Sequence, residues 1–466
     1  PAGAGTARPE APSSAASSGE GMKARVKPPS KAVSAAVRPK QAARNEEAVP
    51  HAAPQAEAAS ADTAPQTAVA DPVRSQAPVS LVAAVPEVGA KAAVPSADTL
   101  RDAVSADAGR ADSGKAQKKA VKGIKDLLDC DKRRCRLESY EENMLYDIKR
   151  GHWDLYDGVE VAEDPEAGRL VPRDPRKDIR TGVVGIDFGT KSTVVVRQDD
   201  TNAIMPIRIG AAVLSAGLLE SDYENPTIIE CTDLDEFIRK YYEKPGRPET
   251  VCEDFFVSYD AYNGYRACPP NEFYAYYADL KQWSNHQKEN VLVLDKQRKE
   301  YRFGVSGSRE DKIINPIELY AYYIGLYINN MRNGIYMKYL MSFPVGYSKE
   351  TRQLILTSFE RGIRKSLPTC ILEDEDCMKD FSVRLGISEP AAYAVTALEM
   401  SDLEPEDEND RYRYGIFDFG GGTADFGFGI WRGASEEEYD IEGYDYVLEC
   451  FGADSDVTLG GENILE

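Results

Sequence analysis

The chain contains 466 residues, 29% of them charged, and its formal net charge is −22. This acidity argues against nucleic acid as a partner, and no apolar run approaches the ~20 residues that a membrane span requires. The eight Cys residues have spacings unlike those of zinc pairs, and only three His residues are present, so we expect unpaired thiols in a reducing, cytoplasmic setting rather than a zinc or histidine metal centre.

Residues 1–120 are rich in Ala and Pro and contain no aromatic residue, because the first aromatic side chain belongs to Tyr140. Such a segment cannot bury enough apolar surface to offset the entropy that it would lose on ordering. We therefore predict a disordered tether over 1–120. An organelle transit peptide is the less favoured alternative for its first 45 residues.

Residues 121–177 are predicted to form a basic helix followed by an irregular joint. The run from Lys115 to Arg136 is rich in Lys and Arg, which predicts a solvated helix; a helix that binds an anionic surface or a partner is the alternative. The remainder is rich in Pro, Asp and Gly, and its Trp153 and Tyr156 can pack against the following domain.

The first informative motif is VVGIDFGTKSTVVV at 183–196. Its β-branched run Val183–Ile186 predicts a buried strand. Asp187-Phe188-Gly189-Thr190 then breaks this strand, and Thr193–Val196 resumes an extended conformation. The motif is therefore a strand, a glycine turn and a second strand.

Three predicted helices separate this motif from its counterpart. Asn315-Pro316 with Glu318 is a helix start, and Leu319, Tyr322, Tyr323, Leu326 and Tyr327 would form one apolar face. Ser348 can cap a second helix that carries Leu354, Ile355 and Phe359. Pro390 suits the first turn of a third helix, over 391–398.

The second motif, YGIFDFGGGTADFGFGIW at 414–431, repeats the pattern of the first. Gly415–Phe417 predicts a strand, Asp418–Thr423 a glycine-rich turn, and Phe426, Phe428 and Ile430 alternate as in a second strand. An acidic loop at Glu404–Asp410 precedes it.

Both turns have the chemistry of a phosphate site. Glycines allow close approach of the backbone, so that successive N–H groups can point at phosphate oxygens, and each turn places an Asp where it could hold hydrated Mg²⁺. One such hairpin is ordinary turn chemistry, but two matching copies favour a shared site. A Walker loop or dinucleotide fingerprint would need a helix after the glycines, and a protein kinase would need a His-Arg-Asp motif, which the chain lacks.

Five motifs in order resemble the DnaK-type heat-shock chaperones of the actin-like ATPase superfamily: GIDFGT at 185–190, MSFPVGYSKETRQLI at 341–355, ISEPAAYAVTAL at 387–398, FDFGGGTADF at 417–426 and TLGGENILE at 458–466. The resemblance implies an α/β, two-lobed, ribonuclease H-like fold, with the first lobe at 178–400 and an incomplete second lobe at 401–466. The rest of the family's second lobe and its peptide-binding domain would lie outside this sequence or on a companion chain.

The same resemblance implies a site for ATP and Mg²⁺. Asp187, Asp418 and Glu389 would hold Mg²⁺ through water, and Lys281 would contact the γ-phosphate and the attacking water. Hydrolysis would depend on positioning and electrostatic stabilisation. The implied nucleotide contacts are Gly189, Thr190 and Lys191 from the first turn, and Gly420, Gly421, Gly422, Thr423 and Asp425 from the second.

Departures from the family pattern leave alternatives open. Lys191 and Ser192 stand where chaperones usually carry Thr and an aromatic residue, Ala424 replaces a common Phe, and a Tyr- and Glu-rich insert spans Tyr241–Tyr277. The expected function is ATP hydrolysis by a chaperone module, with unfolded polypeptides and co-chaperones as partners through parts that are not in this chain. The alternatives are a nucleotide-gated scaffold that does not hydrolyse ATP and, less favoured, a small-molecule kinase of the superfamily.

Overall fold

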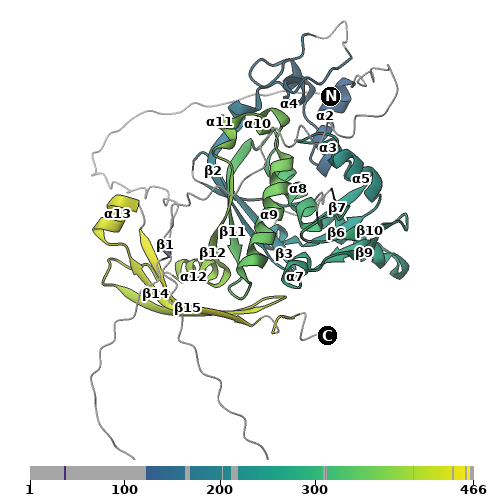
Figure 1. The fold of residues 1–466 in the computed structure, drawn as a ribbon. Coiled ribbons are helices and arrows are strands. Elements are labelled where there is room, and N and C mark those ends of the chain that lie inside the picture. The colour runs from purple at the N-terminus through teal and green to yellow at the C-terminus, as the bar shows by residue number, and fades with distance from the viewer. Residues whose placement is uncertain are drawn as a thin grey trace, which may run out of the picture. The chain divides into compact units, whose positions relative to one another are not determined.

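The computed structural model describes Ala36–Val37 and residues 122–162, 168–201, 203–210, 219–307, 310, 312–401, 403–442, 445–456 and 459–461. These residues belong to one compact unit of mixed α/β structure with several sheets (Figure 1). The predicted tether over 1–120 lies outside the described residues, apart from Ala36–Val37, which form the short strand β1. Within the described part of the chain, no helix is both long enough and apolar enough to cross a membrane.

The largest sheet contains β2 (Ile179–Phe188), β3 (Ser192–Gln198), β4 (Ile204–Pro206), β5 (Asn225–Pro226), β11 (Ile335–Phe343) and β12 (Ser382–Ser388). Its strand order is β12-β11-β2-β3-β4, with β5 also paired to β3. β11 runs parallel to both of its neighbours, whereas β3 is antiparallel to β2. Both strands of the first motif are confirmed, although β2 continues through Asp187 and Phe188 before the chain turns.

Two smaller sheets follow along the chain. One contains β6 (Ile228–Cys231), β7 (Phe255–Val257) and β8 (Tyr276–Ala278), and the other is the hairpin of β9 (Val291–Leu294) and β10 (Glu300–Phe303). The insert Tyr241–Tyr277 supplies β7, most of β8, α6 (Tyr259–Ala267) and the 3-10 turn η4 (Pro270–Ala275). Its Phe255 and Val257 are fully buried, so part of the insert belongs to the core of the fold.

The helices of this part of the chain are α5 (Leu234–Tyr241), α7 (Leu280–Asn285), α8 (Pro316–Ile328), α9 (Lys349–Ser366), α10 (Thr369–Leu372) and α11 (Glu375–Met378), with the 3-10 turn η3 (Glu220–Tyr223) before them. α8 and α9 pack side by side (Figure 1). The predicted starts are confirmed: the Asn315 side chain accepts from Ile317 N at 3.0 Å and from Glu318 N at 3.1 Å, and Ser348 Oγ accepts from Thr351 N at 3.1 Å.

The five residues predicted to form an apolar face on α8 are all buried, but burial extends around the whole helix. Every residue of α8 except Glu318 is buried, because the helix is enclosed on all sides by the main core, which its aromatic side chains help to fill. A helix that is apolar around its whole circumference is typical of such a buried position.

The last sheet has β13 (Arg411–Phe419), β14 (Ala424–Gly433) and β15 (Tyr446–Asp456), in the order β1-β15-β14-β13. The strands of the second motif are thereby confirmed. α12 (Glu389–Met400), with Pro390 in its first turn as predicted, contacts this sheet and also β11 and β12. In the chain, α13 (Glu436–Glu442) follows β14 and precedes β15. Phe417 and Phe428, on the face turned away from α12, remain 61% and 57% exposed.

The segment before β2 forms short elements: α2 (Ile124–Leu128), α3 (Cys130–Cys135), η1 (Glu142–Tyr146), α4 (Trp153–Tyr156) and η2 (Pro175–Asp178). The prediction of a solvated basic helix was wrong for α3, because Asp131 and Arg134 are 1% and 2% exposed. Arg247 reaches them from the insert and donates to Asp131 Oδ1. Charge pairing across the two segments therefore fixes this end of the chain to the domain.

The three tryptophans are buried in three different apolar clusters. Trp153 packs with residues of the joint and, as predicted, with the following domain, where Ile335 and Met337 of β11 belong to the same cluster. Trp283 of α7 belongs to the main core, and Trp431 of β14 packs under α12. Tyr156, the other predicted packing aromatic, is 37% exposed. All eight cysteines are free, as expected, and four of them are buried.

Candidate functional site

The two glycine motifs form hairpin turns of the same construction. We call residues 189–192 turn one and residues 420–423 turn two. Gly189 N donates to Ser192 O at 3.0 Å, and Gly420 N donates to Thr423 O at 2.9 Å. The last strand pairs before the turns are Phe188 with Thr193 and Phe419 with Ala424. A methyl group added to Gly189 would lie 2.4 Å from Ser192 O, so turn one needs glycine for close backbone approach.

Turn one and turn two lie in contact, although more than 200 residues separate them in the sequence. A Cβ built on Gly421 would lie 2.9 Å from Lys191 Cγ, and one built on Gly422 would lie 2.7 Å from Thr190 Oγ1. Gly461 supports turn two from another side, because its N–H donates to Gly420 O at 3.0 Å. The structure thus brings together the two turns that the sequence singled out.

Asp418 and Asp425 are directly paired across β13 and β14. Like charges in that position repel each other, and burial, followed by the charges of Asp425 and Asp187, raises the pKa of Asp418. Asp187 stands near the end of β2, where Ser342 Oγ donates to its Oδ1 at 2.5 Å. Carboxylates from both sheets therefore act electrostatically on one another.

Asp425 is 2% exposed and only half satisfied. Thr423 Oγ1 donates to its Oδ2 at 2.7 Å, whereas its Oδ1 is buried and has no hydrogen-bond partner among the described residues. A buried carboxylate oxygen without a donor is costly unless a ligand or an ordered water completes it.

Lys281, which is buried, and Glu389, which is partly exposed, form an ion pair at the start of α7 and α12. Lys281 Nζ lies 2.6 Å from Glu389 Oε1 and 5.8 Å from the centre of the Tyr347 ring. Burial, reinforced by the charges of Asp187 and Asp425 and opposed by Lys281, raises the pKa of Glu389 to about 7. A pKa that burial and neighbouring charges shift together in this way is typical of a functional site.

The sequence did not single out two other residues of α7 and its cap. Asp279 Oδ1 accepts from Lys191 Nζ at 3.2 Å, and Gln282 Nε2 lies 3.5 Å from Thr190 Oγ1. Their position directly beside Lys281 was the signal that could have pointed to them. With Lys281, these residues connect α7 to turn one, to turn two and to α12.

The acidic residues here fit a hydrated cation better than a directly coordinated one. Among the described residues, no group of three or more His, Cys, Asp or Glu side chains is arranged to hold a metal ion. The carboxylates of Asp187, Asp418, Asp425 and Glu389 nevertheless interact electrostatically, with Lys281 as a counter-charge. Mg²⁺ keeps several waters in proteins and is held by few carboxylates, so this donor set fits such an ion.

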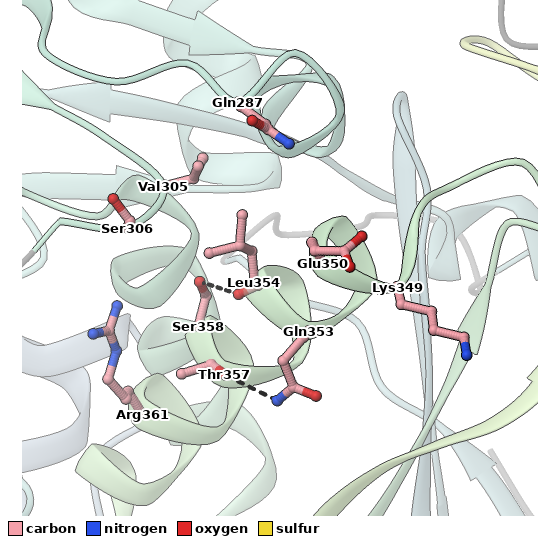
Figure 2. Close-up of a pocket in the computed structure, with 10 residues that line it drawn as sticks. All are labelled: Gln287, Val305, Ser306, Lys349, Glu350, Gln353, Leu354, Thr357, Ser358 and Arg361. Atoms are coloured by element: carbon pink, nitrogen blue, oxygen red, sulfur yellow. Dashed lines mark hydrogen bonds between the residues drawn. The ribbon is translucent and has the colours of Figure 1, made fainter.

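Other hollows of the molecule involve different residues. A pocket of about 820 Å³ lies at the first turns of α9. Figure 2 shows Lys349, Gln353 and Thr357 along one side of this helix. None of the pocket's lining residues belongs to the candidate site. Lys349 and Gln353 are exposed and therefore provide control positions for the experiments below.

No family model matches the chain, and no curated protein matches its sequence. The candidate site is defined by the geometry of turn one, turn two and α7.

Proposed function

We propose that this chain is the nucleotide-binding part of a DnaK-like chaperone ATPase with the two-lobed actin-like fold, and that it holds Mg²⁺-ATP between turn one and turn two. The observation that carries the proposal is the contact between the turns, at Thr190 and Gly422, with the Lys281–Glu389 pair beside them. Two matched glycine turns provide backbone N–H groups from opposite sides, which suits a chain of phosphates.

Side chains around the turns complement the backbone in this proposal. Lys191 is half exposed and lies 3.2 Å from Asp279, so its ammonium can turn from that carboxylate to a phosphate oxygen. The hydroxyl of Thr190 adds a donor next to the glycines, whereas that of Thr423 already donates to Asp425. An anion bound here would gain hydrogen bonds from both turns at once.

The acidic residues would orient water around the cation that accompanies ATP. Asp187 and Asp418 face this position from the two sheets, and Glu389 and the unpaired Oδ1 of Asp425 complete it. When bound, Mg²⁺ would neutralise charge on the phosphates. The carboxylates would hold its water ligands and keep the site ordered for in-line attack by water.

Lys281 would supply the positive charge nearest to the transferred phosphoryl group. In the structure its ammonium is engaged by Glu389 at 2.6 Å. Hydrolysis requires that it also reach a γ-phosphate oxygen or the attacking water, which it could do while it keeps one hydrogen bond to Glu389, because an ammonium has three donors. The tight pairing is the observation that favours the alternative, a nucleotide-gated scaffold without hydrolysis.

The test uses the whole chain with Mg²⁺-ATP. Binding is measured by titration calorimetry, and release of phosphate is followed without any acceptor molecule. We expect binding and slow hydrolysis, with a loss of turnover of about 10²-fold or more in Lys281→Ala, because one electrostatic contact to the transition state is removed. Lys349→Ala, at an exposed position of α9, is the matched control and should keep its activity.

Each alternative predicts a different result. Binding without turnover, unchanged by Lys281→Ala, would exclude both enzyme functions and support the scaffold. Phosphate transfer that needs a metabolite acceptor would support the kinase. Stimulation of hydrolysis by an unfolded peptide would support the chaperone, whose clients and co-chaperones are part of this proposal, as is its place in the reducing cytoplasm, with which the free cysteines agree.

A further inference from the structure

Gln282 lies where turn one, turn two and α7 meet. Its Nε2 is 3.5 Å from Thr190 Oγ1 in turn one. A Cβ built on Gly422 of turn two would lie only 1.8 Å from the same nitrogen. The carboxamide therefore occupies the space that any side chain at position 422 would need, between two turns whose backbones are suited to phosphate.

The orientation of this carboxamide is held from within α7. Asn285 Nδ2 donates to Gln282 Oε1 at 3.3 Å, which leaves Nε2 directed toward the turns. Trp283, the next residue in α7, is 6% exposed and belongs to the main core, so the helix backbone is anchored. Gln282 thus presents an N–H donor whose contact with Thr190 Oγ1 is long for a hydrogen bond.

The charged residues around Gln282 are already paired, so its neutral amide N–H is better placed than they are to donate to a phosphate. Lys191 and Lys281 flank the turns, and each is already paired with a carboxylate, Asp279 or Glu389. A phosphate that replaced those partners would have to compete with them. An amide N–H can donate to a phosphate oxygen without breaking an ion pair.

We infer that Gln282 is a phosphate-binding residue: its Nε2–H donates to a phosphate oxygen held between turn one and turn two, an inference that rests on the proposed nucleotide site. A ligand oxygen with two lone pairs replaces the weak contact to Thr190 Oγ1. Gln282 thereby contributes to affinity for the phosphate part of the ligand and contributes nothing to recognition of a base or sugar.

The experiment compares Mg²⁺-pyrophosphate and Mg²⁺-ATP by titration calorimetry on the whole chain. Gln282→Leu removes the donor at nearly constant size, and we expect it to weaken both ligands about 3- to 10-fold, the effect of one hydrogen bond. Gln282→Glu keeps an acceptor for Asn285 but adds a negative charge, and should weaken binding further. Gln353→Leu, on the exposed side of α9, makes the same exchange outside the site and should bind like the wild type.

The outcomes separate this inference from the proposed function. If the wild-type chain binds neither probe, the proposed nucleotide site itself fails. If the wild type binds both and Gln282→Leu binds them equally well or more tightly, Gln282 is no phosphate ligand and the inference alone fails. Should Gln282→Leu not fold, as judged by its tryptophan emission, Gln282→Met, which also lacks the donor at a similar size and adds no charge, decides the question in the same way.

Discussion

Gly189 and Gly415 differ in the space that surrounds their α-carbons. A Cβ on Gly189 would lie 2.4 Å from the carbonyl oxygen of Ser192, whereas one on Gly415, in β13, would meet no atom within 4 Å. We expect Gly189→Ala to cost about 1–3 kcal/mol in the free energy of unfolding, because backbone atoms must shift. Gly415→Ala should stay within about 0.5 kcal/mol of the wild type.

Urea denaturation of both variants measures this difference. Equal stabilities would show that turn one can open without cost, which would contradict the close backbone approach described here. The loss in Gly189→Ala should be accompanied by weaker binding of phosphate, since the turn carries Thr190 and Lys191.

His152 makes stability depend on pH. Its Nδ1 accepts from Asp154 N at 3.1 Å and its Nε2 donates to Leu127 O at 3.1 Å, so both nitrogens are engaged in the neutral form. Burial lowers the pKa of His152 below its usual value near 6.5, despite the opposing charges of Asp154 and Asp131. The unfolded chain therefore binds a proton below about pH 6.5 while the folded chain does not.

The stabilising contribution of neutral His152 is complete above pH 6.5 and is lost as the pH falls below it. We expect its share of the unfolding free energy to fall by up to about 1.4 kcal/mol per pH unit. His152→Asn keeps an acceptor for Asp154 N without a titrating group, so its slope between pH 6.5 and 5.5 should be smaller than that of the wild type. Parallel slopes would show that His152 is not the responsible group.

At the scale of elements, the N-cap residues of α8 and α9 differ in the hydrogen bonds that they make beyond their own helix. Asn315 caps α8 and its Nδ2 also donates to Val305 O at 2.6 Å and to Ser358 Oγ at 2.9 Å. Ser348 caps α9 at an exposed position. We expect Ser348→Ala to cost about 1 kcal/mol, and Asn315→Ala to cost roughly 2–4 kcal/mol, because buried acceptors lose their donors as well.

Chemical denaturation of the two alanine variants gives both values. A smaller loss for Asn315→Ala than for Ser348→Ala would contradict the view that Asn315 joins α8, α9 and the loop at Val305. Thr357→Ala, nine residues beyond Ser348 on the pocket side of α9, supplies a reference for a change on the same helix away from its cap.

The local structure of the site was predictable, and its tertiary contacts were predictable only in part. The strands around both glycine turns and the caps at Asn315 and Ser348 follow from short-range patterns of apolar, glycine and capping residues. Resemblance pointed to Lys281 and Glu389, which are 108 positions apart and form an ion pair. For Gln282 the sequence offers only its position beside Lys281, since the role of Gln282 depends on which turns α7 meets after folding.

For the molecule as a whole, the buried guanidinium of Arg247 contacts three segments that are distant in the sequence. Its guanidinium donates to Asp131 in α3 and to Asn329 O after α8 at 2.7 Å, and it lies 5.3 Å from the Trp153 ring. The sequence predicted α3 as solvated because a run of Lys and Arg usually is. Only the fold supplies the buried partners that make charges acceptable there.

We expect Arg247→Met to destabilise the chain by about 3–5 kcal/mol, because Asp131 loses a partner inside the protein. Arg239→Met removes an exposed arginine that pairs with Glu236 at 2.7 Å and should change stability by less than about 0.5 kcal/mol. Thermal unfolding measured by circular dichroism distinguishes the two. Similar melting temperatures would mean that the joint before β2 contributes little to the folded state.

Because the three tryptophans are buried in separate places, their intrinsic fluorescence can report on separate regions of the protein. Because Trp153, Trp283 and Trp431 belong to three different apolar clusters, variants that keep one indole at a time would each record the fluorescence of a single region. If the unfolding transitions of these variants coincide, the sheet that contains β2 and the sheet that contains β14 unfold cooperatively. Trp283 is two positions from Lys281 in α7, so its emission alone would also follow ligand entry between the glycine turns without an added dye.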